Sequence, residues 1–457
     1  MTYLSRISRG EIEQNLKSAY DVIKEVDYIT DTYILDFFVE DVWEKLPKDW
    51  RTYLESLSLA ELAQLIDATA AIPKEECIPN SLLNVRESVL RCSLSRDFKQ
   101  YNVLSNSSNF PLFEHLKDGR FESNFFRGVK KKKTYEIMNM SALIYQTTQQ
   151  IPVDFVVDVG GGVGHLSRVL AYVYNVKVIS VDGNKSFITY ANKLNDKIAL
   201  YMKKLKPGVT DLIRPIHICS MVESNITTEE FEKLIQQGTS YGIVGLHPCG
   251  DLAPTLLKLF KTSTNCKFIN IASCCYMKLS TDQEAENEHL GFPVSEESKE
   301  YPIKLSYAAR ELACHALELY KQKLILGNVE DLKVHSYRAL LELLIVEKYP
   351  SRRKEQIKSV KYRDGLTFFE YAERALRCSD IQLNLDEADL QSISEKIDQW
   401  KRVVIVYSLR LMFAPLIETI ILMDRLLYLH NDVGSCDLIP FFDPTISPRT
   451  HVLTATK

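Results

Sequence analysis

The sequence predicts a doubly wound α/β domain, in which helices cover both faces of a largely parallel sheet. The first observation is an apolar run at 155–159 that ends in three consecutive glycines and is followed by apolar residues at helical spacing. The second is that short apolar runs and helical patterns continue to alternate beyond this point. This alternation is the order that parallel βαβ units require.

The expected strands are short and apolar, as strands buried on both faces are, and we place them at 155–159, 177–181, 215–219, 241–246 and 267–272. The glycines end the first strand because glycine turns sharply and lets a ligand approach the backbone. The helix that follows points unpaired N–H groups at whatever lies over this turn. In such a sheet, ligands bind outside the carboxyl ends of the strands.

The chain has 457 residues, which is too long for one compact core. We expect a helical N-terminal region at 1–125. The α/β core is expected at 126–276 and 400–457. A mostly helical insertion is expected at 277–399, because the plain fold requires far fewer residues after its fifth strand.

The glycine-rich turn indicates which cofactor this domain binds. A dinucleotide fingerprint needs a further glycine three residues after Gly162, but that position is His165. The pattern present is Asp158-x-Gly160-x-Gly162-x-Gly164, which resembles motif I of class I S-adenosylmethionine (SAM) methyltransferases. The resemblance implies that Asp158 receives the methionine amino group, directly or through water. It also implies that the three glycines clear space for the methionine chain.

The ends of the second and third strands supply the other expected cofactor residues. Asp182 ends the second strand, about twenty residues after the glycine turn, where an acid accepts both ribose hydroxyls of an adenosine ligand. An acid here also disfavours the 2′-phosphate of NADP. The alternative role of Asp182 is an ordinary turn or helix-capping residue. Ser220 and Met221 follow the third strand and are candidates for the adenine contact.

An imidazole, thiols and a carboxylate follow the fourth and fifth strands. His247 and Asp251 follow the fourth strand, and either is placed to remove a proton from a hydroxyl or amine nucleophile. We also count His247 among the cofactor-binding residues. Cys274 follows the fifth strand and is the candidate for a covalent nucleophile, as in C5 methylation of a base.

A zinc site is the alternative to a thiol-lined substrate pocket at these strand ends. Cys249, Cys274 and Cys275 fall in one neighbourhood with His247. Zinc motifs, however, usually space their thiols two to four residues apart. Adjacent side chains on an extended chain also point to opposite faces. We therefore predict no metal site.

Several motifs, taken in order, resemble the methyltransferase-like 25 family, also called the ribosomal RNA adenine dimethylase domain-containing group. They are Asp-Val-Gly-Gly-Gly-Val-Gly-His-Leu-Ser, Val-Asp-Gly-Asn, Gly-Leu-His-Pro-Cys-Gly-Asp-Leu and Ser-Cys-Cys-Tyr. A Lys-Lys-x-x-Glu segment before the first strand and Phe-Asp-Pro-x-x-Ser-Pro-Arg at 442–449 fit the same group. The resemblance extends across most of the chain. It implies a SAM-dependent methyltransferase fold that closes with an antiparallel hairpin of 436–442 and 450–455.

The family name points to adenine N6 in ribosomal RNA, but the fourth strand departs from that mechanism. Adenine N6 dimethylases share an Asn/Asp/Ser-x-Pro-Tyr/Phe motif after this strand. The present chain has His-Pro-Cys-Gly at 247–250, without the aromatic residue that stacks the base. The N6-dimethylase mechanism is therefore not expected here.

The net charge of −4 provides no overall attraction to nucleic acid, so any RNA binding must be local. Two basic runs could contact the phosphates of a tRNA or rRNA substrate, and a solvated surface is the alternative for each. They comprise Lys130, Lys131, Lys132 and Lys133, and Arg352, Arg353 and Lys354.

The ten cysteines have no regular spacing and are expected to be reduced thiols of a cytoplasmic or nuclear protein. No signal peptide is evident. The segment 403–423 is very apolar, but Arg410, Pro415 and Glu418 interrupt it. We expect a core helix at 400–430 rather than stable insertion in a membrane.

Two classes of function are compatible with these patterns. The first is an active SAM-dependent methyltransferase whose acceptor is RNA, with a protein or a small molecule as other acceptors. The second is a catalytically silent module of the same fold that binds RNA or protein partners. The oligomeric state is left open.

Overall fold

The computed structural model describes residues 8–98, 123–205, 212–235, 240–281, 291–301, 304–430 and 432–457. The chain divides into two compact units. The first unit comprises Met1–Leu16, Ser95–Pro302 and Ile420–Lys457, and the second comprises Lys17–Leu94 and Ile303–Thr419. The N-terminal helical region and the helical insertion, predicted as separate regions, thus contribute to one unit.

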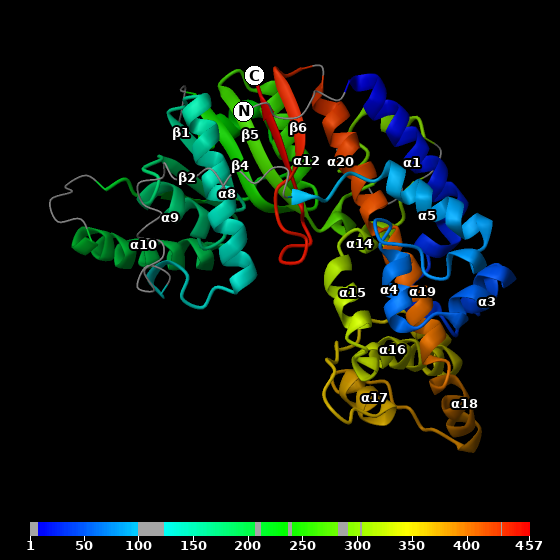
Figure 1. Ribbon diagram of the computed structural model, residues 1–457. Helices are drawn as coiled ribbons and strands as arrows, with labels where there is room; N and C mark the ends of the chain where they lie inside the picture. The colour runs from blue at the N-terminus through cyan, green and yellow to red at the C-terminus, as the bar shows by residue number, and fades with distance from the viewer. Residues whose placement is uncertain are drawn as a thin grey trace. The chain divides into compact units, whose positions relative to one another are not determined.

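The first unit contains a seven-stranded sheet with the order β3-β2-β1-β4-β5-β7-β6 (Figure 1). β1 to β5 run parallel, and only β7 and β6 are antiparallel to their neighbours. This order confirms the doubly wound fold and the closing hairpin. The strands are β1 (Phe155–Val159), β2 (Val178–Asp182), β3 (Ile216–Cys219), β4 (Tyr241–Cys249), β5 (Cys266–Cys274), β6 (Ser435–Pro440) and β7 (His451–Thr456).

The chain reverses direction across the sheet between β1 and β4, and this reversal defines where a ligand can bind. All five residues of β1 are buried, and β1 pairs with β2 on one side and with β4 on the other. Crossovers between parallel strands are right-handed. Helices after β1 and after β4 therefore cover opposite faces, and their connections separate at the carboxyl ends of these strands, where a crevice forms.

The helices of the first unit bury their apolar faces against this sheet. α8, α9 and α10 share one apolar cluster, and α8 and α9 also pack on the strands through residues that include Leu143, Leu166 and Val244. α12 packs on β4 and β5. The helices are α8 (Lys131–Gln150), α9 (His165–Tyr172), α10 (Lys185–Leu205), α11 (Thr228–Leu234), α12 (Leu252–Thr262), η5 (Tyr276–Lys278) and α13 (Glu296–Lys299).

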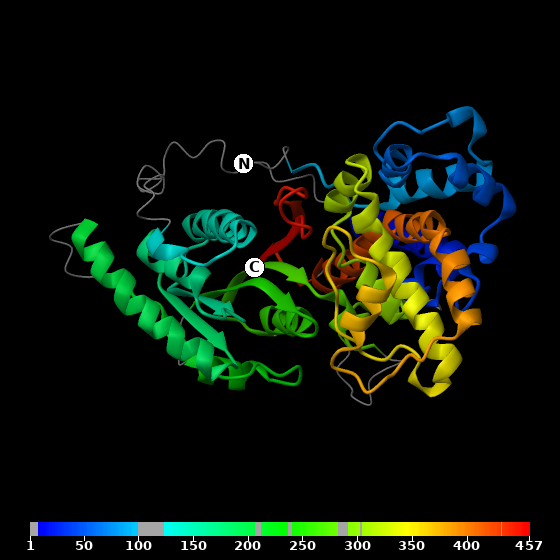
Figure 2. The ribbon, with the colours of Figure 1, turned by 90° about the horizontal axis from the view of Figure 1, so that it is seen from below.

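The second unit is helical, and Figure 2 shows its helices from a second direction. Phe37, Phe38, Trp43 and Trp50 are all buried in its core. Its elements are η1 (Ile34–Asp36), α2 (Val42–Lys45), α3 (Lys48–Ser56), α4 (Leu59–Ile66), η2 (Glu75–Cys77), α5 (Asn80–Cys92), α14 (Tyr307–Leu312), α15 (Leu317–Ile325), α16 (Val329–Lys348), η6 (Pro350–Arg352), α17 (Phe368–Leu376), α18 (Glu387–Ile397) and α19 (Trp400–Met412).

Two helices, α1 (Arg9–Thr30) and α20 (Ala414–His430), run across the boundaries between the units. The single helix predicted at 400–430 is broken at Phe413, between α19 and α20. Pro415 accounts for the break because it cannot donate the backbone hydrogen bond that a continuous helix needs. This segment is long and apolar enough to cross a membrane, with a mean hydropathy of 1.8, but 89% of its most apolar window is buried within the protein.

Candidate functional site

An open cleft of about 700 Å³ lies at the carboxyl ends of β1, β2, β3 and β4. This is the position expected for a ligand site in a doubly wound sheet. Five of the residues predicted to contact a cofactor line the cleft, namely Gly160, Asp182, Ser220, Met221 and His247. Apolar walls are provided by Val159, Val181 and Leu252.

The carboxylate of Asp182 lines the cleft and is held in place by hydrogen bonds from the backbone. Its Oδ2 accepts a hydrogen bond from the Gly162 N–H at 2.8 Å, and its Oδ1 accepts one from the Asn184 N–H at 2.9 Å. A carboxylate has about four lone-pair positions, so each oxygen can accept another hydrogen bond. The Asp182 carboxylate is therefore oriented by the glycine turn and retains the capacity to accept two hydroxyl groups.

The three predicted glycines have different roles. Gly160 lines the cleft, whereas Gly162 donates its N–H to Asp182. Gly164 begins the turn into α9 with a φ of +73°, and a Cβ there would lie only 2.4 Å from the His217 ring. Gly164 thus allows the backbone to pass close to His217, and it does not line the cleft.

Asp158 does not line the cleft, and its contact with the methionine amino group, directly or through water, stays a prediction. Its side chain is buried, and its Oδ2 accepts a hydrogen bond from Ser167 Oγ at 2.5 Å. A Cβ on Gly161 would lie 3.0 Å from the same oxygen. The alternation of side chains along β1 directs Asp158 towards α9. In this position the Asp158 side chain packs against the glycine turn.

The buried position of Asp158 should make stability depend on pH. Burial raises the pKa of this carboxyl to about 6, and the nearby Asp182 acts in the same direction. The pKa of Asp158 is higher in the folded state than the unfolded value of about 3.9, so protonation of this carboxyl stabilises the folded protein in acid. This stabilisation is lost as the pH rises through about 6. The loss amounts to about 3 kcal/mol for this shift. An Asp158→Asn variant has no titratable group at this position, so it should not lose this stability as the pH rises.

The measurement is the thermal unfolding midpoint of the Asp158→Asn variant minus that of the wild-type protein, taken from pH about 4 to about 8. We expect this difference to become more favourable to the variant as the pH rises. A difference that does not change with pH would contradict the buried, proton-binding environment of Asp158.

His247 is paired with a glutamate from a distant part of the chain. His247 has a φ of +69°, and its Nε2 lies 2.9 Å from Glu136 Oε2 on α8. Glu136 is buried, and its other oxygen accepts a hydrogen bond from Ser447 Oγ at 2.6 Å. Burial acts to raise the pKa of Glu136, but the hydrogen bonds from His247 and Ser447 and the charge of Lys132 lower it overall. Glu136 is therefore an anionic partner that orients the His247 ring.

Sequence reasoning did not assign a role to Glu136. Its signal was present as the last residue of the Lys-Lys-x-x-Glu segment, but nothing in the sequence links it to His247, 111 positions away. The contact arises because α8 packs alongside β4.

Asp251 was predicted as a base beside the cofactor, and the structure places it elsewhere. Its Oδ1 accepts a hydrogen bond from the Ser280 N–H at 2.8 Å, and a Cβ on Gly291 would lie 1.8 Å from that oxygen. Gly250, with a φ of +55°, turns the chain before this residue. Asp251 therefore borders a pocket of about 170 Å³ and not the cleft, and its role as a base stays a prediction.

Comparison with known proteins agrees with this architecture. Residues 130–282 match a family model described as a methyltransferase domain. This chain contains a methyltransferase domain. The matched residues include α8, β1 to β5 and the cleft, so the domain is the part of the chain that carries His247, Asp182 and Glu136.

The similar proteins support the resemblance found in the motifs. The chain is 31% identical over 271 residues to the probable methyltransferase-like protein 25 of Mus musculus. It is 32% identical over 257 residues to that of Homo sapiens. These matches cover 56% and 53% of this chain, and 44% and 41% of the respective relatives. The chain thus matches less than half the length of these relatives.

Solved structures of the plantazolicin methyltransferase BpumL in complex with SAH are also similar to this chain. Their sequence identity is 15%, and their TM-scores are 0.22 and 0.21. The alignments cover 62% and 68% of this chain, and 88% and 93% of those chains. Scores this low support no inference about ligands of the present domain.

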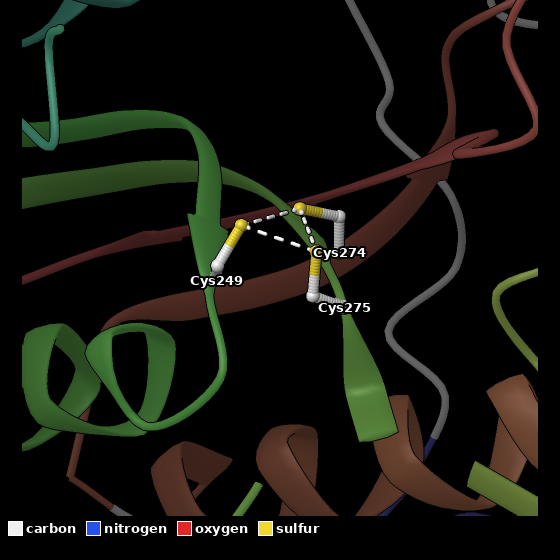
Figure 3. Close-up of side chains that lie close together, drawn as sticks. All are labelled: Cys249, Cys274 and Cys275. Carbon is white, nitrogen blue, oxygen red and sulfur yellow. Dashed lines mark hydrogen bonds between the residues drawn. The ribbon is translucent and has the colours of Figure 1, made fainter. Parts of the chain in front are cut away.

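Three thiols of the methyltransferase domain lie in mutual contact at the ends of β4 and β5 (Figure 3). Cys249 Sγ lies 3.1 Å from Cys274 Sγ and 3.2 Å from Cys275 Sγ, and the last two sulfurs are 3.5 Å apart. The expectation that adjacent Cys274 and Cys275 point to opposite faces is wrong. Cys275 has a φ of +52°, a left-handed conformation that ends the extended chain and turns its sulfur towards the other two.

Cys249 rather than Cys274 has the properties of a reactive thiol. Its hydrogen bond with Cys274, and then that with Cys275, lower the pKa of Cys249 to about 6. The contact with Cys249, together with burial, raises the pKa of Cys274. Cys249 is exposed and lines the cleft. A thiol with a raised pKa is a poor nucleophile. Cys274 is therefore disfavoured as the covalent nucleophile.

The two basic runs differ in how their charges are paired. Arg352 pairs with Asp380 at 2.7 Å, Arg353 with Asp36 at 2.7 Å and Lys354 with Asp36 at 2.8 Å. These pairs offset the positive charge of that run. By contrast, Lys130, Lys131, Lys132 and Lys133 are all exposed. Lys130 precedes α8, and the other three lie in its first turn, where Lys132 pairs with Glu136 at 3.6 Å.

Proposed function

We propose that the methyltransferase domain binds SAM in the cleft and transfers its methyl group to an RNA nucleophile whose proton is taken by His247. The observation that carries this proposal is that Asp182 and His247 line the same cleft at the reversal of the sheet. Asp182 can hold an adenosine ribose, and His247 can take a proton from the acceptor. No other pair of predicted residues combines these two chemistries in the part of the chain that the structure describes.

The residues of the cleft fit the chemistry of SAM. The Asp182 carboxylate, held by Gly162 and Asn184, can accept the two ribose hydroxyls. Met221 and Val222 offer apolar surface for the adenine, and Gly160 leaves room for the methionine chain. When bound, SAM supplies a methyl group that its sulfonium has already activated, so the protein mainly has to align the acceptor.

His247 and Glu136 provide the proton transfer in this proposal. In the tautomer in which His247 Nε2 carries the hydrogen and donates it to Glu136, the other ring nitrogen, Nδ1, has a lone pair. This lone pair can take the proton of the acceptor. The Glu136 carboxylate then stabilises the imidazolium that forms. An anion that orients a histidine base and stabilises its protonated form is a recurrent catalytic arrangement.

The choice of RNA as acceptor rests on the four lysines at the start of α8. Glu136 on α8 contacts His247 of the cleft, so the first turn of α8 lies beside the cleft. Lysines that lie here can bind the phosphates of a substrate whose nucleophile enters the cleft. The run at 352–354 is less suited to bind phosphates, because acidic side chains already pair with Arg352, Arg353 and Lys354.

We further propose that the protein works in the cytoplasm or the nucleus. All ten cysteines, each of which lies in a described range, are outside any disulfide. Reducing compartments keep thiols in this state.

The test is to incubate the purified protein with methyl-labelled SAM and, separately, with cellular RNA, protein and small-molecule fractions. We expect label in RNA and its loss in a His247→Ala variant. Label in protein or a small molecule would overturn the RNA acceptor. SAM binding without any transfer would favour the silent module instead.

A Lys130→Gln/Lys131→Gln/Lys133→Gln variant tests the contact with phosphates. It should weaken RNA binding and reduce the slope of log affinity against log salt by about 2, since each contact with single-stranded RNA contributes about 0.7. The matched control replaces Lys193, Lys197 and Lys204, which are exposed on α10. An equal change in the control would contradict a role for the lysines of α8.

A further inference from the structure

We propose that Cys249, Cys274 and Cys275 form a binding site for a thiophilic metal ion, with Zn²⁺ as the ion to be tested. The proposal does not depend on SAM binding, and the sequence pattern argued against it. Figure 3 shows the three sulfurs turned towards one another from two strand ends. Their separations of 3.1, 3.2 and 3.5 Å are those of a compact triangle.

The sulfur geometry suits a tetrahedral ion. Zinc–sulfur bonds are about 2.3 Å long, which places the sulfurs of a tetrahedral site roughly 3.8 Å apart. The three thiols therefore need to separate by only about half an ångström to hold an ion above their triangle. As each bond forms, the thiol loses its proton to solvent and the thiolate binds the metal. No oxidant or reductant is required.

The backbone is arranged to bring the three sulfurs together. Cys249 is paired directly with Cys274 across β4 and β5, after an irregular register that begins at Leu246. His247 and Cys275, which flank the cluster, both have positive φ. Such conformations are unfavourable for residues other than glycine, by about 1 kcal/mol or more each. A bound ion would offset this cost, whereas hydrogen bonds among the sulfurs, which are weak donors and acceptors, offset little of it.

The charge around the cluster favours thiolates bound to a metal. Zn²⁺ with three thiolates carries one net negative charge. Arg425 is 1% exposed, and its Nη1 and Nη2 have no hydrogen-bond partner within the described part of the chain. Its guanidinium lies 5.7 Å from the centre of the ring of Tyr276, the residue after Cys275, and its charge interacts with Asp424, Cys274 and Asp251. This buried cation can balance the charge of the metal site.

Three protein ligands leave one position of a tetrahedral ion for another group. Zinc sites that bind water or substrate have this arrangement, whereas purely structural sites are closed by a fourth protein ligand. Cys249 is the exposed member of the cluster and also lines the cleft. An ion held by these thiols is therefore accessible from the cleft.

The experiment measures zinc bound per 457-residue chain, in protein that is purified under reducing conditions and desalted after addition of one equivalent of Zn²⁺. Variants Cys249→Ser and Cys275→Ser each remove one ligand. Cys378→Ser, which removes an exposed thiol of the second unit, is the matched control. Thermal unfolding verifies that each variant is folded. Cobalt substitution provides a second readout, since sulfur-to-cobalt charge-transfer absorption grows with the number of thiolate ligands.

We expect about one zinc per chain in the wild-type protein and in Cys378→Ser, with an affinity at least about tenfold weaker in both cluster variants. The cobalt absorption should fall by about a third in each cluster variant. Failure of the reduced wild-type protein to retain zinc would overturn the proposal. So would equal zinc retention in the cluster variants, or a Cys249–Cys274 disulfide in protein that has been kept reduced. None of these results depends on methyl transfer.

Discussion

Replacing Asp182 by alanine should weaken SAM binding at least about 100-fold. A carboxylate that accepts two ribose hydroxyls makes two charge-assisted hydrogen bonds, each worth about 1.5–3 kcal/mol. The same substitution removes the acceptor for the Gly162 and Asn184 N–H groups and so loosens the glycine turn. Isothermal titration calorimetry with SAM and SAH measures the change in Kd directly.

Two further variants separate ribose binding from loss of structure. Asp182→Asn keeps the shape of the side chain but loses its charge and one acceptor, and its affinity should lie between those of the wild type and Asp182→Ala. Asp196→Ala removes an exposed carboxylate of α10 that pairs with Arg214, and it should bind SAM normally. A folded Asp182→Ala variant with unchanged affinity would reject the assignment of the ribose site.

Replacing His247 by alanine should lower kcat by about 10²- to 10⁴-fold, the range associated with loss of a general base. SAM affinity should change by only a few-fold, because the expected contacts to the ribose come from Asp182. Glu136→Gln removes the anion beside the imidazole while keeping a side chain of the same size, so kcat should fall by a smaller factor, about tenfold or more. Single-turnover rates at saturating SAM and RNA separate these effects from substrate binding.

The pair can be tested as a unit. If Glu136 acts through His247, adding Glu136→Gln to His247→Ala should lower kcat little further, because residues that act together are not additive. His430→Ala, at the end of α20 and outside the cleft lining, is the control. Full activity of His247→Ala would remove His247 from the mechanism. Additive effects of the two substitutions would show that Glu136 does not act through His247.

The sequence predicted the sheet and the positions of Asp182 and His247 at strand ends, because those features depend on local pattern. Buried parallel strands are recognisable as short apolar runs, and the position of Asp182 at the end of one follows from the run itself. β4 and β5 extend to Cys249 and Cys274, beyond their apolar runs. Hydrophobic pattern does not report such an extension, because polar residues at a strand end still pair through the backbone.

The rest of the site depends on contacts and backbone angles that pattern does not encode. Asp158 has the right position for a cofactor residue, but packing against Ser167 determines its direction. The left-handed conformation of Cys275 overturns the alternation rule that separated it from Cys274. Glu136 meets His247 only through the packing of α8 on the sheet.

A crystal structure of the 457-residue chain with SAH tests the central claim most directly. We expect the adenosine in the cleft at the ends of β1, β2 and β3, with both ribose hydroxyls about 2.5–3.0 Å from the Asp182 carboxylate. The sulfur should face His247. SAH bound elsewhere on the domain, or ribose hydroxyls that do not contact Asp182, would contradict the account.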